Sequence, residues 1–198
     1  MLGARHLISS MKSGPPMLTI EPIDVKYSTA IHRIISDPQL ARTSDIPSSP
    51  SLDDARAWIG RMKRLEELRT GQIFVILVND LVVGVCGLYG IDNVSGTAEL
   101  GFFVGSDYWR HGYATAGSGL LLTAGFVDMG LKSVRASCLT WNDGAKRVLH
   151  KLGFQALNEG PPPPKSKFPQ TEKYLYWSLA KNRYLDGKDT GARYSLLP

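Results

Sequence analysis

The stretch from Glu99 to Thr115 combines a strand-like run, a basic loop that contains a glycine, and the start of a helix. This order leaves backbone N–H groups unpaired at the helix N-terminus, where the positive end of the helix dipole also lies. Arg110 and His111 add side-chain donors beside these groups. Such a combination attracts phosphate. The stretch therefore predicts a site for a phosphorylated ligand, in a fold where a strand leads directly into a helix.

Composition indicates one globular domain. The chain has 198 residues, of which 43% are hydrophobic and 21% charged, and a chain of this length can bury a core without disulfides. Its net charge of +5 suits an anionic ligand. Nucleic acid is the other usual partner of a basic chain, but the Lys and Arg residues are spread along the sequence without a long run. This distribution disfavours nucleic acid as the main partner.

Cys86 and Cys138 each lie in an apolar, strand-like run, and their separation matches no metal-ligand spacing. We expect both thiols to be buried, no metal site, and a reducing compartment such as the cytoplasm. No apolar run approaches the roughly 20 residues of a membrane span, so no membrane partner is expected. Residues 1–17 contain bases and no acid, which weakly resembles a transit segment, although a flexible tail is the simpler interpretation.

Hydrophobic periodicity and turn residues divide the chain into strands and helices. An early antiparallel part precedes a part in which strands and helices alternate, so we expect a mixed sheet in an α/β (α+β) domain. The expected strands are 18–23, 72–78, 82–89, 98–104, 133–139, 154–157 and 172–179, and the expected helices are 25–36, 51–68, 115–129 and 143–152. A polar tail is expected after the last strand.

Two familiar phosphate-binding loops are excluded. The dinucleotide fingerprint G-x-G-x-x-G fails because Leu122 stands where the third glycine is needed. The nucleotide-hydrolase loop requires Gly-Lys-Ser/Thr, which occurs nowhere in the chain.

Two other blocks resemble the GNAT superfamily of N-acetyltransferases. Trp109-Arg-His-Gly-Tyr-Ala114 resembles the coenzyme A loop Q/R-x-x-G-x-G/A, with Trp109 in place of the leading Gln or Arg. The run Asn142-Asp-Gly-Ala-Lys-Arg-Val-Leu-His-Lys-Leu-Gly-Phe154 is similar to N-x-x-S-x-R-V-L-x-K-L-G-F, which is typical of the branch that resembles ribosomal-protein alanine acetyltransferases. Only the serine is lost, at Ala145. The resemblance covers residues 18–179 and leaves 1–17 and 180–198 as tails.

The resemblance implies that the fourth and fifth strands splay apart and that acetyl-CoA (coenzyme A) threads the gap. Backbone groups of Phe103 and Val104 would pair with the pantetheine arm, as an added strand would. Asn142 would contact the same arm. Lys146 and Arg147 would lie near the adenosine phosphate, although a solvated helix face is the simpler interpretation of both. The pyrophosphate would be held by the loop residues Arg110, His111, Gly112, Tyr113, Ala114 and Thr115.

The implied activity is acetyl transfer to a primary amine, on a protein N-terminus or a small molecule. An ammonium has no lone pair, so a base must remove a proton, and Glu99 is the first candidate. An ion-paired strand residue is the alternative interpretation of Glu99. A backbone N–H near Val104 would stabilise the oxyanion. Many relatives protonate the leaving thiolate with a tyrosine where this chain has Leu149, so Tyr108, Tyr113 and Ser137 are the remaining candidates.

The sequence leaves open whether the protein turns over its donor, which acceptor it uses and whether it is a monomer. Leu149 and Ala145 depart from the family pattern, which allows a non-catalytic module that binds coenzyme A. The acceptor would be chosen by residues 25–68 and 160–170, where the sequence carries no recognisable code. A monomer and a homodimer are both compatible with the sequence.

Overall fold

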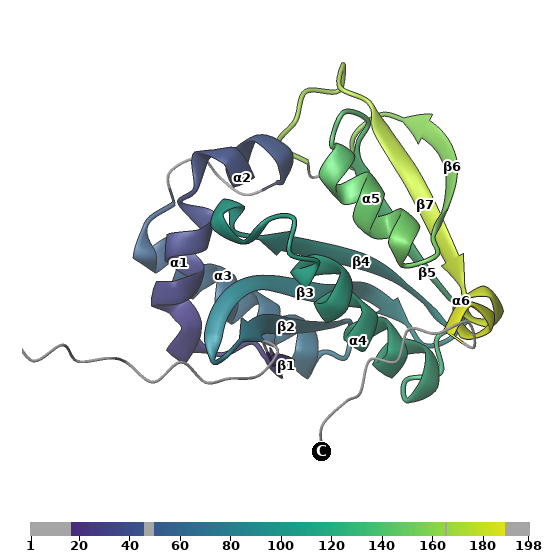
Figure 1. Ribbon diagram of the computed structural model, residues 1–198, viewed down its shortest axis with the longest axis horizontal. Coiled ribbons are helices and arrows are strands. Elements are labelled where there is room, and N and C mark those ends of the chain that lie inside the picture. The colour runs from purple at the N-terminus through teal and green to yellow at the C-terminus, as the bar shows by residue number, and fades with distance from the viewer. Residues whose placement is uncertain (1–16, 46–49, 165, 189–198) are drawn as a thin grey trace, which may run out of the picture.

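The computed structural model describes residues 17–45, 50–164 and 166–188. They form one seven-stranded sheet with helices on both faces (Figure 1). The strand order is β1-β2-β3-β4-β5-β7-β6, and every neighbouring pair is antiparallel except β4 and β5, which run parallel. The mixed α/β domain that the sequence predicts is confirmed.

The elements follow the expected order, with two additional helices. They are β1 (Leu18–Pro22), η1 (Val25–Tyr27), α1 (Ser28–Ile35), α2 (Pro38–Thr43), α3 (Leu52–Glu67), β2 (Gly71–Val78), β3 (Leu81–Asp92), β4 (Thr97–Val104), η2 (Ser106–Tyr108), α4 (Tyr113–Val127), β5 (Ser133–Leu139), α5 (Asp143–Lys151), β6 (Gln155–Gly160), β7 (Tyr174–Ala180) and α6 (Lys181–Lys188). Among the described residues, no helix has the length and apolarity that crossing a membrane requires.

Two apolar cores lie on the two faces of the sheet. One packs α1 and α3 against β2 and β3, and the other packs α4 and α5 against β3, β4 and β5. Helix α4 approaches the sheet closely, because a side chain on Gly117 would meet the side chain of Ile76 at 2.8 Å. Cys86 and Cys138 are both buried, as expected.

Strands β4 and β5 pair over only three residues each. Thr97–Glu99 lies beside Ser133–Arg135, and beyond that point β5 pairs with β7 alone while β4 continues along β3. The expected splay of these strands is therefore confirmed. It opens the sheet from Glu99 onward and leaves the far half of β4 without a partner on one side.

Side-chain caps explain where several of the helices begin. Ser51 and Asp54 form a reciprocal capping box at the start of α3, in which the Asp54 N–H donates to Ser51 Oγ at 3.1 Å and the Ser51 N–H donates to Asp54 Oδ2 at 2.8 Å. The expected helix over 25–36 begins as the short η1 turn before α1.

Helix α2 is not among the predicted helices, because the expected helix ends at residue 36 and Pro38 would ordinarily stop a helix. In the structure Asp37 caps a new helix and Pro38 occupies its first turn, where proline needs no N–H partner.

The expectation of a polar tail directly after β7 is wrong for residues 181–188, which form α6. Tyr184 anchors this helix: its side chain is buried, its hydroxyl donates to the Gly119 carbonyl at 2.7 Å, and its ring lies 5.1 Å from that of Phe126. A single aromatic residue in a polar segment produces no hydrophobic periodicity from which a helix could be predicted.

We expect Tyr184→Ala to lower the free energy of unfolding by about 3–5 kcal/mol, because it removes a buried aromatic ring. Tyr184→Phe should lower it by about 1 kcal/mol through the lost hydrogen bond. Urea denaturation measures both, with the exposed neighbour Leu185→Ala as the control. Equal effects of Tyr184→Ala and Leu185→Ala would contradict the packing of α6.

Candidate functional site

A cleft of about 560 Å³ opens where β4 and β5 diverge. Its walls come from the end of β4, the loop before α4, the first turn of α4, the start of α5 and the end of α2. It brings together most of the sequence-predicted residues: Phe103, Val104, Tyr108, Arg110, Gly112, Tyr113, Ala114, Thr115, Asn142 and Arg147. Glu99, His111 and Lys146 do not line it.

The first turn of α4 presents backbone N–H groups to this cleft. Gly112 is the N-cap with a left-handed backbone (φ 82°), and no side chain caps the terminus. The first helical bond begins only at Ala116, whose N–H donates to the Gly112 carbonyl at 2.9 Å. The N–H groups of Tyr113, Ala114 and Thr115 therefore precede the helical ladder. Such a terminus is an anion site.

The loop that leads into α4 is fastened to β4. Trp109 Nε1 donates to the Val104 carbonyl at 2.7 Å, which gives this residue a structural role in place of the Gln or Arg of the pattern. Arg110 also has a left-handed backbone (φ 65°), and alternating backbone conformations of this kind gather N–H groups around an anion. His111 is exposed and stacks on Tyr113, with 5.3 Å between ring centroids.

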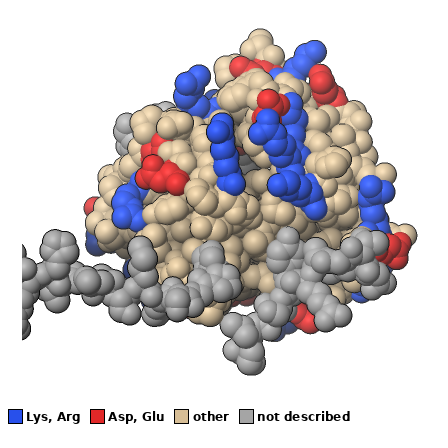
Figure 2. Space-filling view, in the orientation of Figure 1, with Lys and Arg blue, Asp and Glu red and all other residues tan. Residues whose placement is uncertain are grey.

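Cationic side chains border the same cleft. Arg110, Arg147 and Lys151 line it, and Lys and Arg side chains lie over α5 and the loop before α4 in Figure 2. Lys151 follows Arg147 by one helical turn and is not among the predicted site residues, although i,i+4 spacing is a readable signal. Lys146 is tied to its own helix terminus instead: Nζ lies 2.7 Å from Asp143 Oδ1 and 2.6 Å from the Thr140 carbonyl.

Asn142 joins α5 to α2. Its Oδ1 accepts the N–H of Ala145 at 3.0 Å, which caps α5, and its Nδ2 donates to the Thr43 carbonyl at 3.2 Å. Helix α2 is thereby held as a wall of the cleft, to which it contributes Leu40, Thr43 and Ser44.

The alternation of backbone direction along β4 determines which of its N–H and C=O groups face the gap. The Gly105 N–H donates to the Val83 carbonyl at 3.0 Å, so Gly105 is directed toward β3. Backbone direction alternates along a strand, so Phe103 is also directed toward β3, whereas Phe102 and Val104 are directed toward the gap. The β4 backbone groups that an added strand would meet are therefore those of Phe102 and Val104, and Phe103 is directed away from the gap.

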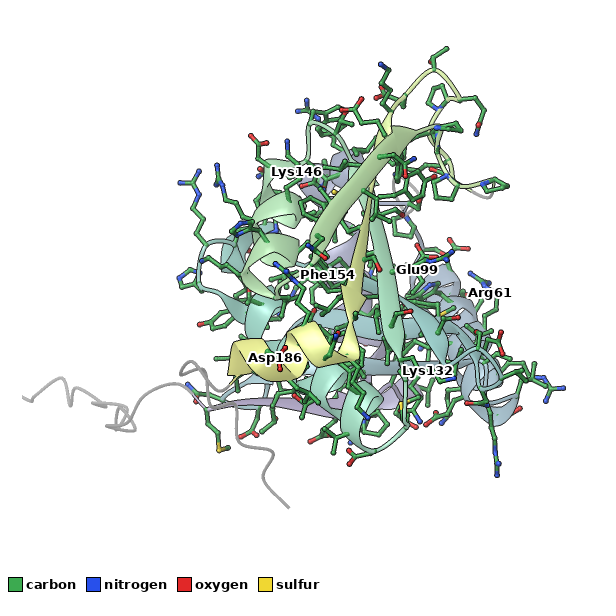
Figure 3. The ribbon with its side chains drawn as sticks, turned by 90° about the vertical axis from the view of Figure 1, so that its right-hand side faces the viewer. Arg61, Glu99, Lys132, Lys146, Phe154 and Asp186 are labelled. Carbon is green, nitrogen blue, oxygen red and sulfur yellow. The ribbon has the colours of Figure 1, made fainter. Side chains whose placement is uncertain are left out.

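Glu99 lies at the fork, which is the point where β4 and β5 stop pairing. Its side chain is on the opposite face of the sheet from those of Phe102 and Val104. Figure 3 shows it on the side of α3, which carries Arg61, and away from α5, which carries Lys146. Its side chain is exposed, and Ser137 Oγ on β5 donates to Glu99 Oε1 at 3.3 Å. A carboxylate thus stands where the gap between β4 and β5 begins.

Leu149 lies in the core with 1% of its surface exposed, together with Leu152 and Phe154. It offers no proton donor. Tyr108 lines the cleft and is the sequence-predicted hydroxyl placed there together with Tyr113.

Asp37 links α2 to the loop that precedes α4. Its carboxylate accepts the Gln39 N–H at 2.8 Å and the Ser106 N–H at 3.0 Å. Burial raises the pKa of this carboxyl, but the hydrogen bonds from Ser106, Gln39 and Leu40 outweigh burial, and the pKa is lowered below 3.8. The folded protein therefore favours the ionised form.

The end of α2 is also held to the segment between β6 and β7. Asp45 accepts hydrogen bonds from Ser166 Oγ at 2.7 Å and from the Lys167 N–H at 2.9 Å. Lys167 Nζ in turn donates to the Ala41 carbonyl at 2.6 Å. Burial raises the pKa of the neighbouring Tyr174 to about 12. These contacts connect the two halves of the sheet beyond the point where β4 and β5 part.

The comparisons with known proteins agree with this geometry. The model of the acetyltransferase (GNAT) domain family matches residues 17–155. The uncharacterized N-acetyltransferase p20 of Bacillus licheniformis is 27% identical over 169 residues, which cover 84% of this chain and 94% of that protein. The uncharacterized N-acetyltransferase YoaA of Bacillus subtilis is 25% identical over 140 residues, 70% of this chain and 79% of the relative.

Solved structures share the fold. The ribosomal L7/L12 alpha-N-protein acetyltransferase RimL, in complex with coenzyme A, matches with a TM-score of 0.75 and 14% identity over 82% of this chain and 93% of its own. The spermidine N-acetyltransferase of Vibrio cholerae, in complex with CoA and spermine, matches with a TM-score of 0.73 and 14% identity over 85% and 98%.

We expect Asp37→Ala to lower the free energy of unfolding at pH 7 by about 1–2 kcal/mol, because it removes a helix cap and the partner of the Ser106 N–H. Since the folded-state pKa is lowered, the stabilisation is present above the ordinary pKa of the group and is lost as the pH falls through the folded value. The difference between wild type and variant should therefore shrink in acid.

Urea denaturation at pH values from 7 down to 3 measures this difference. Asp107→Ala, an exposed carboxylate in the neighbouring η2, is the control. A difference for Asp37→Ala that stays constant down to pH 3 would contradict the role of the ionised carboxylate.

Proposed function

Because the chain belongs to the acetyltransferase (GNAT) domain family, we propose that it transfers the acetyl group of acetyl-CoA directly to a primary amine. The observation that carries this proposal is the uncapped N-terminus of α4, which faces a cleft with basic side chains where two strands diverge. The cleft offers a phosphate site at one end and an unpaired strand at the other. This is the shape and chemistry that a donor with a pyrophosphate and two amides requires.

The residues of the cleft fit such a donor. The N–H groups of Tyr113, Ala114 and Thr115 would hold the pyrophosphate, and Arg110, Arg147 and Lys151 would balance its charge. The Phe102 carbonyl and the Val104 N–H would pair with amides of the pantetheine arm, since the Val104 carbonyl already accepts from Trp109 Nε1. Asn142 would border that arm from the wall formed by α5 and α2.

The chemistry is divided between the two faces of the sheet. Glu99, held by Ser137 at the fork, would take a proton from the amine directly or through water. The Phe102 N–H, also directed into the gap and closer to Glu99 along β4 than Val104, would donate to the developing oxyanion. Tyr108 would return a proton to the leaving thiolate from within the cleft. The group supplied by the donor is an activated acetyl thioester.

The acceptor is an amine of a protein N-terminus or of a small molecule. An α-amine has a pKa of about 7.7–8.0, whereas a lysine amine has a pKa of about 10.4. An exposed carboxylate therefore deprotonates an α-amine more easily than a lysine amine. Proteins that share this fold include a ribosomal L7/L12 alpha-N-protein acetyltransferase and a spermidine N-acetyltransferase. Both kinds of acceptor remain candidates for this chain, with selection by α1, α2, α3 and the segment that Asp45 binds.

A second candidate function is a module that binds coenzyme A without turnover. The buried Leu149 in the place of the family's tyrosine favours it. An assay for free thiol separates the two functions. The protein is mixed with acetyl-CoA and with either spermidine or peptides that begin with alanine, serine or methionine. Coenzyme A binding without thiol release would support the module, and absence of both would contradict the two proposals together.

We expect Glu99→Gln to lower kcat by about 100-fold or more, because proton removal is lost while the shape is kept. The affinity for coenzyme A should not change, since Glu99 lies outside the cleft. Steady-state thiol release and calorimetric binding measure the two quantities. The matched control is Glu66→Gln, an exposed glutamate on α3, and an equal loss in both variants would argue against a base at Glu99.

We expect Arg147→Gln to weaken coenzyme A binding by about tenfold, because it removes a charged donor to phosphate. Lys146→Gln should weaken binding much less, since the Lys146 ammonium is engaged with Asp143 and the Thr140 carbonyl. Titration calorimetry at constant salt compares the two. A larger effect of Lys146→Gln than of Arg147→Gln would contradict the assignment of Arg147 as the phosphate-binding side chain of α5.

A further inference from the structure

Tyr89 on β3 lies directly across from Glu99 on β4 and belongs to the same face of the sheet. Its ring leans over a pair of glycines that face each other, Gly87 and Gly101. A side-chain carbon on either glycine would come within 2.9 Å of the ring. The two glycines therefore leave the space that the ring occupies, and the ring covers the backbone of β4 just beyond Glu99.

The surroundings of this ring are aromatic and apolar. Phe103 follows Gly101 on the same face of β4, and its ring centroid lies 6.0 Å from that of Trp58 on α3. Tyr89, Phe103 and Trp58 all pack partly buried against the core beneath α1 and α3. Glu99 and Tyr89 thus form the polar edge of an aromatic surface.

The hydroxyl of Tyr89 has no hydrogen-bond partner within the part of the chain that the structure describes. Burial of the side chain, followed by the charges of Cys86 and Glu99, raises its pKa, so the hydroxyl stays protonated at neutral pH. The residue nevertheless keeps an intermediate exposure to solvent. A half-buried phenol beside a carboxylate can therefore still bind a partner from outside the chain.

The acceptor has to approach from this face. Under the function proposed above, the donor occupies the cleft on the face of α4 and α5, and the gap between β4 and β5 presents its reacting end to the opposite face. Glu99 stands at the start of that gap, and Tyr89 is its neighbour across the strands.

We propose that Tyr89 is a specificity-determining residue that contacts the acceptor amine. Its hydroxyl hydrogen-bonds the acceptor next to the reacting nitrogen, and its ring limits the bulk of the group attached there. Glu99 acts on the proton, and Tyr89 orients the molecule that carries it. The acceptor class is a primary amine on a slender carbon chain that can lie along an aromatic surface.

Tyr89→Phe and Tyr89→Leu test this role. Phenylalanine keeps the ring and removes only the hydroxyl, so kcat/KM for the acceptor should fall by about three- to tenfold, as expected for one hydrogen bond. KM for acetyl-CoA and the melting temperature should not change. Leucine shortens the side chain, so the ratio of kcat/KM between peptides that begin with methionine and those that begin with alanine should rise.

Tyr27→Phe is the matched control, because the Tyr27 hydroxyl bonds Glu21 on the edge strand β1, which is separated from β3 by β2. One outcome is that the wild type acetylates the peptides or spermidine while both Tyr89 variants keep the wild-type kcat/KM values for these acceptors. That result would overturn the role of Tyr89 and leave the proposed function standing. A wild type that binds coenzyme A and acetylates none of these probes would overturn the proposed function and this inference with it. A uniform loss for every acceptor, matched by a lower melting temperature, would assign Tyr89 a purely structural role.

Discussion

The early separation of β4 and β5 is the constraint on which the rest of the molecule depends. A parallel pair that ends after Glu99 and Arg135 leaves the rest of β4 without a neighbouring strand on one side. In a closed sheet the N–H and C=O groups on that side would bind a neighbouring strand, and leaving them unsatisfied in an apolar interior would be costly. The divergence therefore creates a site that accepts an extended chain with amide groups, between two apolar cores that keep their own packing.

A sheet that opens in this way needs ties beyond the fork. Helix α2 supplies them, since it is bound through Asp37 to Ser106, through Thr43 to Asn142, and through Asp45 to Ser166 and Lys167. All are polar contacts between segments distant in sequence, and several involve a charged group, which makes them stronger than neutral hydrogen bonds. The gap can thus stay open while the two halves of the sheet remain in register.

The sequence predicts the parts of this arrangement that local chemistry determines. The capping box of α3, the glycine that begins α4 and the strand at 133–139 each follow from residues within a few positions of one another. Helix α6 could not be predicted in this way, because it depends on burial of Tyr184 against α4. Helix α2 does carry a local start signal, Asp37 followed by Pro38, but the same two residues also indicate the end of the preceding helix. The choice of Phe102 over Phe103 required the strand register, which no motif encodes.

The same distinction explains why the donor can be inferred from the sequence and the acceptor cannot. A pyrophosphate is bound by backbone N–H groups of one helix turn, so the requirement for Gly112 and its neighbours leaves a contiguous pattern. The acceptor face is assembled from β3, β4, β5 and α3, with Tyr89, Glu99, Ser137 and Trp58 separated by dozens of positions. Each of these residues alone resembles an ordinary strand or helix residue. Only the cross-strand pairing of Tyr89 with Glu99, at the point where the sheet opens, turns them into a single surface with a chemical preference.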